Sequence, residues 1–371
     1  MKRSLSIVLS IIMVMMLVTA CSGKQNAPQS STPESSAKPA PSSSAVEPAS
    51  SDSAGKYDPN WKIACVYSSI TGDYWGVAYN GCEAALDELK AEYGISGYCV
   101  APAQSGDYTQ QMDLLDTVLL EKASGLVLCP SNSESIGAYV TDKFTDDSIP
   151  IIVIDRSLNS DSPAIIGSYA TDAYSMSQGQ FEMAKKAMAD KDEVYFIHLG
   201  ISPENQQWAD RSYGFLDSAK NDPKFINYIE DGDGVYWVAQ VTDQICVQFL
   251  QDTFNSNPDK TFLVLGTSNG YNNDAVTAVS ELSKEKKANI TIIGWDFSAT
   301  ELGLLKTGEM YGAMGQNPFK MGYDSTFMMC DYLAGDKEAA KDKTVPWIGI
   351  DITNVDSDES KEYMKSLGMN V

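Results

Sequence analysis

The sequence is poor in histidine and in basic residues. Histidine occurs once in 371 residues, as His198, and 27 lysines and arginines stand against 50 aspartates and glutamates, for a formal net charge of −23. A surface of this sign repels phosphate backbones and anionic lipid headgroups, so we expect no nucleic-acid partner. An acidic chain can be disordered, but 10% aromatic and 43% hydrophobic residues predict a globular protein with a core.

Several motifs of enzymes and cofactor sites are missing. No strand-like run is followed by G-x-G-x-x-G, the dinucleotide-binding fingerprint, and "EDGDG" at 230–234 lacks the later ligands of a calcium loop. "GTSNG" at 266–270 does fit the G-x-S-x-G of serine hydrolases, with Ser268 as nucleophile. In that fold the histidine follows the serine, whereas His198 precedes it, so hydrolysis stays a remote alternative. We expect no catalytic residue, no cofactor and no metal site.

The apolar run near the start is too short to span a bilayer, which takes roughly 20 apolar residues. It extends from about Leu5 to Val18 and follows two basic residues, so residues 1–20 are predicted to be a secretory signal peptide. The segment ends "VTAC", which resembles the lipobox of bacterial lipoproteins. We expect Cys21 to be lipidated. The open alternative is an ordinary signal peptide cleaved nearby, with Cys21 incidental.

Large apolar residues are almost absent from the stretch that follows. Ser, Pro and Ala dominate residues 22–56, and Val46 is the one large apolar residue there. Such a segment cannot bury enough surface to fold, so residues 21–57 are predicted to be a lipidated cysteine and a disordered tether. A flexible chain of this length spans roughly 30 Å. We therefore expect the folded part near the outer face of the cytoplasmic membrane of a Gram-positive bacterium, with the lipid as its only membrane contact.

The remaining cysteines show no C-x-x-C spacing. Most of them lie inside apolar runs or on helical faces: Cys65, Cys82, Cys99, Cys129, Cys246 and Cys330. A chain of this length needs no covalent staples, so we expect small buried hydrophobic side chains in preference to a disulfide framework. The sequence leaves their redox state open.

Short apolar runs alternate with helical patterns from Trp61 onward. The runs are 62–67, 97–102, 125–130, 151–155, 164–168, 193–200, 234–239, 261–266, 290–296 and 310–316. Amphipathic stretches such as 75–91, 109–122 and 241–254 lie between them. Continuous apolar strands separated by helices predict parallel sheets covered on both faces. The strands are too many for one modest sheet, so the predicted fold class is α/β with two doubly wound parallel-sheet lobes.

Polar and aromatic side chains gather where these strands end. In "IPIIVIDRS", for example, four apolar residues run directly into Asp155 and Arg156. Any single case could be a helix cap or a surface ion pair, but the recurrence in both halves of the chain favours a site, because open parallel sheets bind ligands beyond the carboxyl ends of their strands. Aromatic faces match the C–H patches of a sugar ring, and Asp, Arg, Asn and Gln hydrogen-bond hydroxyls. We expect a small polyol as ligand.

Taken in order, these stretches resemble the type I periplasmic-binding-protein family, in particular the ribose- and galactose-binding proteins of ABC importers. The resemblance runs from Trp61 to about Asp351 and rests on "IACVYSSITGDYW", "GLVLCPSNSESIG", "IPIIVIDRS", "ADRSYGF", "GVYWVAQ", "IIGWD" and "GAMGQNPFKMG". It implies that nine residues bind the ligand: Tyr74, Trp75, Asp155, Arg156, Arg211, Trp237, Asn269, Asp296 and Gln316.

The sequence departs from the family pattern at three places. "GTSNGYNNDAV" holds two extra residues, so Asn273 is an alternative to Asn269. Cys129 stands where ribose binders usually carry a sugar-contacting amide, and Asp73 stands where they have proline. The ligand is therefore expected to be a monosaccharide, with pentose or hexose and furanose or pyranose left open.

The resemblance also implies the domain organisation and the function. One lobe would comprise 58–172 and 317–345, the other 173–316 and 346–371, joined by three hinge strands. The protein would be a monomeric extracytoplasmic lipoprotein that closes its lobes on a monosaccharide and delivers it to an ABC permease. A tethered sugar sensor that presents its closed form to a chemoreceptor or sensor kinase is the open alternative. A sugar-responsive repressor would instead begin with a helix-turn-helix.

Overall fold

The computed structural model describes residues 55–204, 206–238 and 244–371. The expected signal peptide, Cys21 and nearly all of the tether lie outside these residues. Within them, no helix combines the length and the apolar character needed to cross a membrane. The expected end of the tether at residue 57 needs a correction, because Tyr57 is only 5% exposed and its hydroxyl donates to Asp331 (2.7 Å). Packed structure therefore includes Tyr57.

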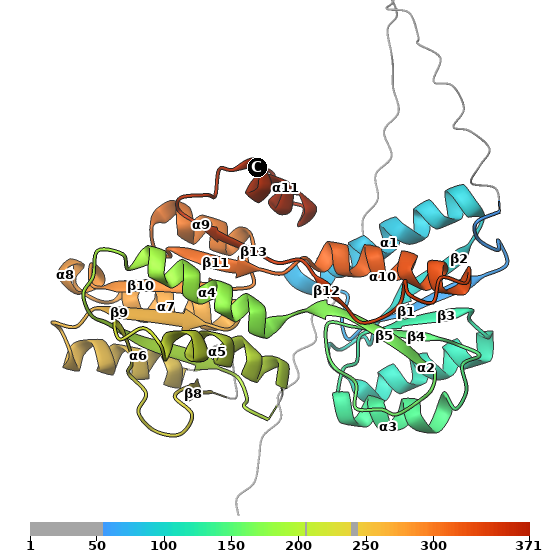
Figure 1. The fold of residues 1–371 in the computed structure, drawn as a ribbon, viewed down its shortest axis with the longest axis horizontal. Helices are drawn as coiled ribbons and strands as arrows, with labels where there is room; N and C mark the ends of the chain where they lie inside the picture. The colour runs from blue at the N-terminus through green and yellow to red at the C-terminus, as the bar shows by residue number, and fades with distance from the viewer. Residues whose placement is uncertain (1–54, 205, 239–243) are drawn as a thin grey trace, which may run out of the picture. The chain divides into compact units, whose positions relative to one another are not determined.

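The first lobe is built on a six-stranded sheet in which all pairings are parallel. Figure 1 labels its strands, which follow one another across the sheet in the order β12 (Lys343–Val345), β5 (Ile165–Thr171), β4 (Ile151–Ile154), β3 (Gly125–Leu128), β1 (Lys62–Val66) and β2 (Ser96–Val100). Four helices pack on it: α1 (Gly72–Tyr93), α2 (Tyr108–Glu121), α3 (Ser133–Lys143) and α10 (Pro318–Leu333).

Alternating side chains of the first sheet supply two separate cores. Ile63 and Cys65 of β1 pack with α1 and α10, whereas Ala64 and Val66 pack with α2 and α3. Successive side chains of a strand point to opposite faces of the sheet. Because both faces of this sheet are buried, the residues that point to either face are apolar. The sequence therefore shows a continuous apolar run where an exposed sheet would show apolar and polar residues in turn.

The second lobe is built on a seven-stranded sheet. Its strands follow the order β13 (Ile348–Asp351), β11 (Gly312–Gly315), β10 (Ile290–Trp295), β9 (Phe262–Gly266), β6 (Val194–Gly200) and β7 (Phe225–Asn227), with β8 (Tyr236–Trp237) also paired to β6. Only β13 runs antiparallel to its neighbour. The helices of this lobe are α4 (Ala173–Ala187), α5 (Gln206–Ala219), α6 (Gln244–Ser256), α7 (Asn269–Ser280), α8 (Lys284–Lys287), α9 (Ala299–Thr307) and α11 (Asp358–Ser366).

The chain crosses between the two sheets three times. It does so between β5 and α4, between β11 and α10, and between β12 and β13. The two faces of the second sheet carry separate cores, one with α4 and α5 and the other with α6, α7, α9 and α11. The predicted fold class, two doubly wound parallel-sheet lobes joined by three connections, is confirmed.

All six cysteines among the described residues are free and buried. Cys65 and Cys99 lie opposite each other on neighbouring strands, and the hydroxyl of Thr326 lies 3.9 Å from the Cys65 sulfur. They pack as small apolar side chains of the cores, as expected.

Candidate ligand-binding site

Two aspartates end equivalent central strands of the two lobes in the same backbone conformation. Asp155 follows β4, Asp296 follows β10, and both have φ of 62°. A non-glycine residue rarely adopts this left-handed region, and aspartate tolerates it better than most. Left-handed residues that cost of order 1–3 kcal/mol cluster at functional sites, where the surrounding structure holds them. The pair therefore marks the carboxyl ends of both sheets as a candidate site.

Asp155 belongs to a group of four residues that we call the first-lobe cluster: Tyr74, Trp75, Asp155 and Arg156. The Tyr74 hydroxyl donates to Asp155 Oδ1 (2.5 Å), and Arg156 Nε lies 3.6 Å from Asp155 Oδ2. The Arg156 guanidinium lies over the Trp75 ring, 5.3 Å from its centroid, and donates weakly to the Pro130 carbonyl (3.4 Å). The cluster thus joins the start of α1 to the ends of β3 and β4.

Asp296 belongs to a matching group, the second-lobe cluster: Arg211, Asn269, Asp296 and Gln316. Arg211 Nη1 donates to Asp296 Oδ2 (3.3 Å), and Gln316 Nε2 donates to Oδ1 (2.7 Å). Asn269 Nδ2 donates to the Asp296 backbone carbonyl (3.1 Å). These residues come from α5, α7 and the ends of β10 and β11, so the topology of the parallel sheet brings together side chains up to 105 positions apart, since 316 minus 211 is 105.

A hydrogen bond joins the two lobes beside the clusters. Gln207 Nε2, on α5, donates to the Asp155 backbone carbonyl (2.5 Å), which links the second lobe to the end of β4. Tyr74 of the first-lobe cluster lines the same cavity as Asn269, Asp296 and Gln316. Residues that the sequence placed on different lobes therefore face one common space.

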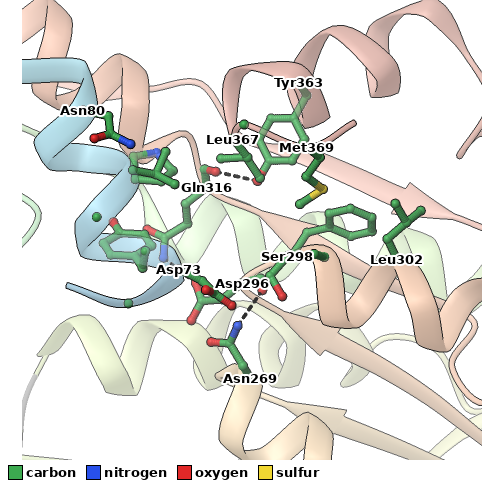
Figure 2. A pocket seen from close by; sticks show the side chains of 18 of the residues that line it. Asp73, Asn80, Asn269, Asp296, Ser298, Leu302, Gln316, Tyr363, Leu367 and Met369 are labelled. Carbon is green, nitrogen blue, oxygen red and sulfur yellow. Dashed lines mark hydrogen bonds between the residues drawn. The ribbon is translucent and has the colours of Figure 1, made fainter. Parts of the chain in front are cut away.

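That cavity has a volume of about 510 Å³. Figure 2 shows Asn269 and Asp296 on one side of it, α1 with Asp73 and Asn80 on another, and Tyr363, Leu367 and Met369 from the C-terminal end on a third. A pocket of roughly 300–1,000 Å³ with a few polar groups among apolar ones is typical of small-molecule sites.

Burial dominates the electrostatics of the second-lobe cluster. It raises the pKa of Asp296 above its ordinary range, against the opposing effects of Arg211 and the Gln316 hydrogen bond; the Asp155 charge raises it further. Burial, with the Asp155 carboxylate next in importance, also raises the pKa of the Tyr74 hydroxyl, which stays a proton donor at neutral pH. The carboxylates of Asp155 and Asp296, one from each lobe, therefore repel each other.

The second-lobe cluster retains one buried donor that no described residue uses. Arg211 Nε is buried and has no hydrogen-bond partner among the described residues. Leaving a buried donor unsatisfied costs about 1–3 kcal/mol, so a hydroxyl that reaches it gains that amount back. Two carboxylates, two guanidinium groups, two amides and adjacent aromatic rings suit a polyol with several hydroxyls and apolar C–H faces.

Trp237 is the predicted residue that joins neither cluster. Its indole N–H donates to the Asp233 carboxylate (2.9 Å), and its ring packs edge-on to Tyr213 and covers Gly200. It is not among the residues that line the cavity. Its position at the end of a strand places Trp237 at the edge of the sheet where the clusters lie. Its side chain, however, lies against α5 and the 230–234 turn.

The choice between Asn269 and Asn273 is clearer in the structure. Asn269 begins α7 and lines the cavity, whereas Asn273 is exposed one turn further along the helix and does not line it. Asn272, between them, is fully buried and donates to the Trp295 carbonyl (2.8 Å). The geometry favours Asn269.

Ser268 and His198 do not form a catalytic pair in the described residues. Ser268 Oγ has no hydrogen-bond partner there, and neither ring nitrogen of His198 has one. Full burial lowers the pKa of His198 to about 3, and the ring packs against Phe215. Because a nucleophile needs a base within hydrogen-bond reach, this arrangement gives Ser268 no activating group.

Sequence reasoning missed residues that lie on helices or near the C-terminal end. Gln207 and Trp208 precede Arg211 by four and three positions, so one helical face carries all three, and the Arg211 guanidinium lies 4.3 Å from the Trp208 ring centroid. This helical spacing from Arg211 could have identified Gln207 and Trp208 as candidate site residues from the sequence. The sequence around Leu367 and Met369 gave no such signal, because no local pattern shows where a terminal segment packs.

Comparisons with known proteins agree with this architecture. A family model described as "Periplasmic binding protein domain" matches residues 63–337. No curated protein matches the chain.

Three solved structures illustrate the fold similarity. A carbohydrate transporter solute-binding protein from Agrobacterium radiobacter, in complex with D-arabinose, is 21% identical, with a TM-score of 0.64 over 82% of this chain and 98% of that one. An ABC transporter solute-binding protein from Agrobacterium vitis, bound with α-D-tagatopyranose, is 18% identical (TM-score 0.66; 82% and 99% covered). An arabinose-binding protein from Geobacillus stearothermophilus is 21% identical (TM-score 0.63; 80% and 98%). Since the family model covers more than half of the sequence, the chain belongs to the periplasmic-binding-protein family.

Proposed function

We propose that the protein captures a sugar between its two lobes and delivers it to an ABC transporter permease. The observation that carries this proposal is the pair of matched clusters, one at the strand ends of each lobe, each centred on an aspartate with φ of 62°. The solved relatives bound to D-arabinose and α-D-tagatopyranose support a monosaccharide as the ligand class.

The clusters explain how a ligand would drive closure. A ligand shifts a conformational equilibrium only through its different affinity for the two states, so it must contact both lobes to favour the closed one. Asp155 and Arg156 offer hydroxyl-binding groups from the first lobe, and Arg211 and Asp296 offer them from the second. Hinge closure about the three connections would then bury the sugar, and the permease would recognise the closed form.

The setting follows from the same proposal. Residues 58–172 with 317–345 would form the first lobe, and 173–316 with 346–371 the second. The lipid on Cys21 would hold a monomeric protein at the outer face of the membrane, and the tether would let the closed form reach the permease. Neither a nucleic acid nor a catalytic step has a part in this cycle.

A thermal-shift screen against aldoses and ketoses tests the proposal. A ligand at a hundredfold excess over its Kd stabilises the folded state by about 2.7 kcal/mol, so the cognate sugar should raise the Tm clearly. Sugar alcohols and amino acids serve as controls. A panel in which amino acids shift the Tm and no sugar does would contradict a sugar ligand.

A further inference from the structure

The cavity between the clusters has two kinds of wall. Tyr74, Asn269, Asp296 and Gln316 line one end with hydroxyl, amide and carboxylate groups. The other end is lined by apolar side chains of the second lobe: Phe297, Leu302, Leu367 and Met369. We call this second set the apolar wall. It continues the cavity away from Asp155, Arg156 and Arg211, none of which lines it.

The apolar wall is held in place by the core of the second lobe. Phe297 and Leu302 are buried there, and the half-buried Leu367 and Met369 pack against the same core. The Tyr363 hydroxyl donates to the Gln316 backbone carbonyl (2.6 Å), which ties α11 to the end of β11 and brings the C-terminal residues over the cavity. Figure 2 shows Leu367 and Met369 on the side of Asp296 opposite Asn269.

The cavity is larger than one sugar ring requires. Its 510 Å³ lies within the roughly 300–1,000 Å³ that is typical of sites for drug-sized ligands, which are larger than a single sugar ring. A ring held by Asp155 and Arg211 also lies partly outside this cavity, which leaves still more of the space unfilled. The lobes already touch through Gln207 and Asp155, so the space exists with the two sides in contact.

We propose that the ligand is a sugar with an apolar substituent, such as an alkyl or aryl glycoside. The ring would bind the two clusters and the substituent would bind the apolar wall. This inference rests on the proposed sugar-binding function and narrows its ligand. A second sugar ring fits less well, because its hydroxyls would face the apolar groups of Phe297, Leu302 and Leu367. Ser298 also lines that end, but its hydroxyl donates to Glu301; Asn370 is exposed, and Asp73 and Asn80 lie on the α1 side.

Titration calorimetry with glycosides of one sugar tests this. After the Tm screen has identified a sugar that binds, its methyl and butyl glycosides and its disaccharide are titrated. Each methylene buried from water contributes about fourfold in affinity, so three added methylenes should strengthen binding at least tenfold. Met369→Ser should reduce this gain, taken as the ratio of the butyl to the methyl glycoside affinity in the same variant, to below threefold. Val371→Ser, on the same terminal segment but outside the cavity lining, should leave the gain unchanged.

The outcomes separate this inference from the function on which it rests. A free sugar that binds while its butyl glycoside binds no tighter than the methyl one overturns the apolar wall as a subsite and leaves sugar binding intact. A gain for the disaccharide alone overturns the assignment of an apolar substituent. If no sugar or glycoside binds, the proposed function fails and the inference fails with it.

Discussion

At the scale of single residues, Asp155 can be read in two ways, as a ligand group or as part of an ion pair that stiffens the end of β4. Its side chain is 6% exposed and has Tyr74 and Arg156 as partners, which fits both readings. The two roles differ in how the Asp155 charge affects the stability of the ligand-free protein. A carboxylate that repels Asp296 across the cavity contributes little to apo stability, whereas a structural ion pair contributes directly.

We predict that Asp155→Asn weakens sugar binding about 10–100-fold, because a charge-assisted hydrogen bond is worth about 1.5–3 kcal/mol. The Tm of the apo variant should not fall, since the amide keeps the shape and relieves repulsion. Calorimetry with the bound sugar and melting curves of both apo forms provide the measurement. Asp142→Asn, at an exposed position, is the matched control. A loss of affinity below threefold would rule out Asp155 as a ligand group.

Asp296 should show a pH-dependent penalty in the apo protein. Burial raises its folded-state pKa above the ordinary 3.8, so the ionised form is less stable in the folded than in the unfolded chain. The loss of folding free energy is therefore complete at pH values above the folded-state pKa, and it disappears as the pH falls through that pKa towards 3.8. Asp296→Asn should therefore be more stable than the wild type at pH 7, with a margin that shrinks as the pH is lowered towards about 4.

Denaturant unfolding of wild type and Asp296→Asn between pH 4 and 7.5 measures this margin. Comparing the two proteins at each pH cancels the titration of the other carboxylates. A margin that grows on acidification would mean that the Arg211 and Gln316 contacts outweigh burial and that the pKa of Asp296 is lowered in the folded state.

At the scale of elements, α5 carries the contacts that sequence reasoning did not anticipate. Trp208 lies flat enough against Arg211 for a cation–π contact of 4.3 Å, one helical turn from the residue that the family resemblance singled out. Neither tryptophan lines the cavity, but Trp208 contacts Arg211 of the second-lobe cluster, whereas Trp237 is fixed by Asp233 and Tyr213. These positions predict opposite behaviour for two tryptophans of the same lobe.

Trp208→Ala should weaken sugar binding by roughly 0.5–1.5 kcal/mol or more, because it removes the ring that orients Arg211. Trp237→Ala should lower the Tm of the apo protein and change the affinity by less than twofold. Parallel melting and calorimetric measurements on the two variants provide the comparison. A Trp237→Ala variant with lost affinity and an unchanged Tm would restore the aromatic-wall role expected from the sequence.

The strands that the sequence predicted are those with continuous apolar runs. Each of the ten runs overlaps a strand, and the runs are clearest for β1, β3, β4 and β9, where burial on both faces demands apolar residues at consecutive positions. β7, β12 and β13 have three or four residues each and partly exposed sequences, so no periodicity marks them. The site follows the same logic. Strand ends are visible in a sequence, so Asp155, Asp296 and Gln316 could be predicted, whereas the cavity side of a helix or of the C-terminal segment depends on packing that no local pattern encodes.

At the scale of the whole molecule, the charge distribution favours an open apo state. The chain carries a net charge of −23, and the Asp155 carboxylate of the first lobe repels that of Asp296 in the second, which raises the pKa of Asp296. Moving the lobes together brings Asp155 and Asp296 closer, and at 0.1 M salt this repulsion is screened only beyond about 10 Å. A bound polyol would hydrogen-bond both carboxylates and offset this repulsion. Closure thus depends on simultaneous contacts with the two clusters.

A variant that weakens one cluster should therefore bind without closing fully. Suppose that saturating sugar favours the closed wild type by about 100 to 1. A loss of about 100-fold in closed-state affinity in Asp296→Asn then brings the ratio of closed to open protein at saturation to about 1 to 1, because a ligand shifts an equilibrium only by its differential affinity.

Small-angle X-ray scattering should show a clear decrease in the radius of gyration of the wild type with saturating sugar, and about half that decrease in the variant. The decrease is measured from each protein's own apo radius, because Asp296→Asn also relieves the repulsion that favours the open apo state. Full compaction of Asp296→Asn at saturation would show that the first-lobe cluster closes the molecule alone, and the clamp mechanism would then be wrong.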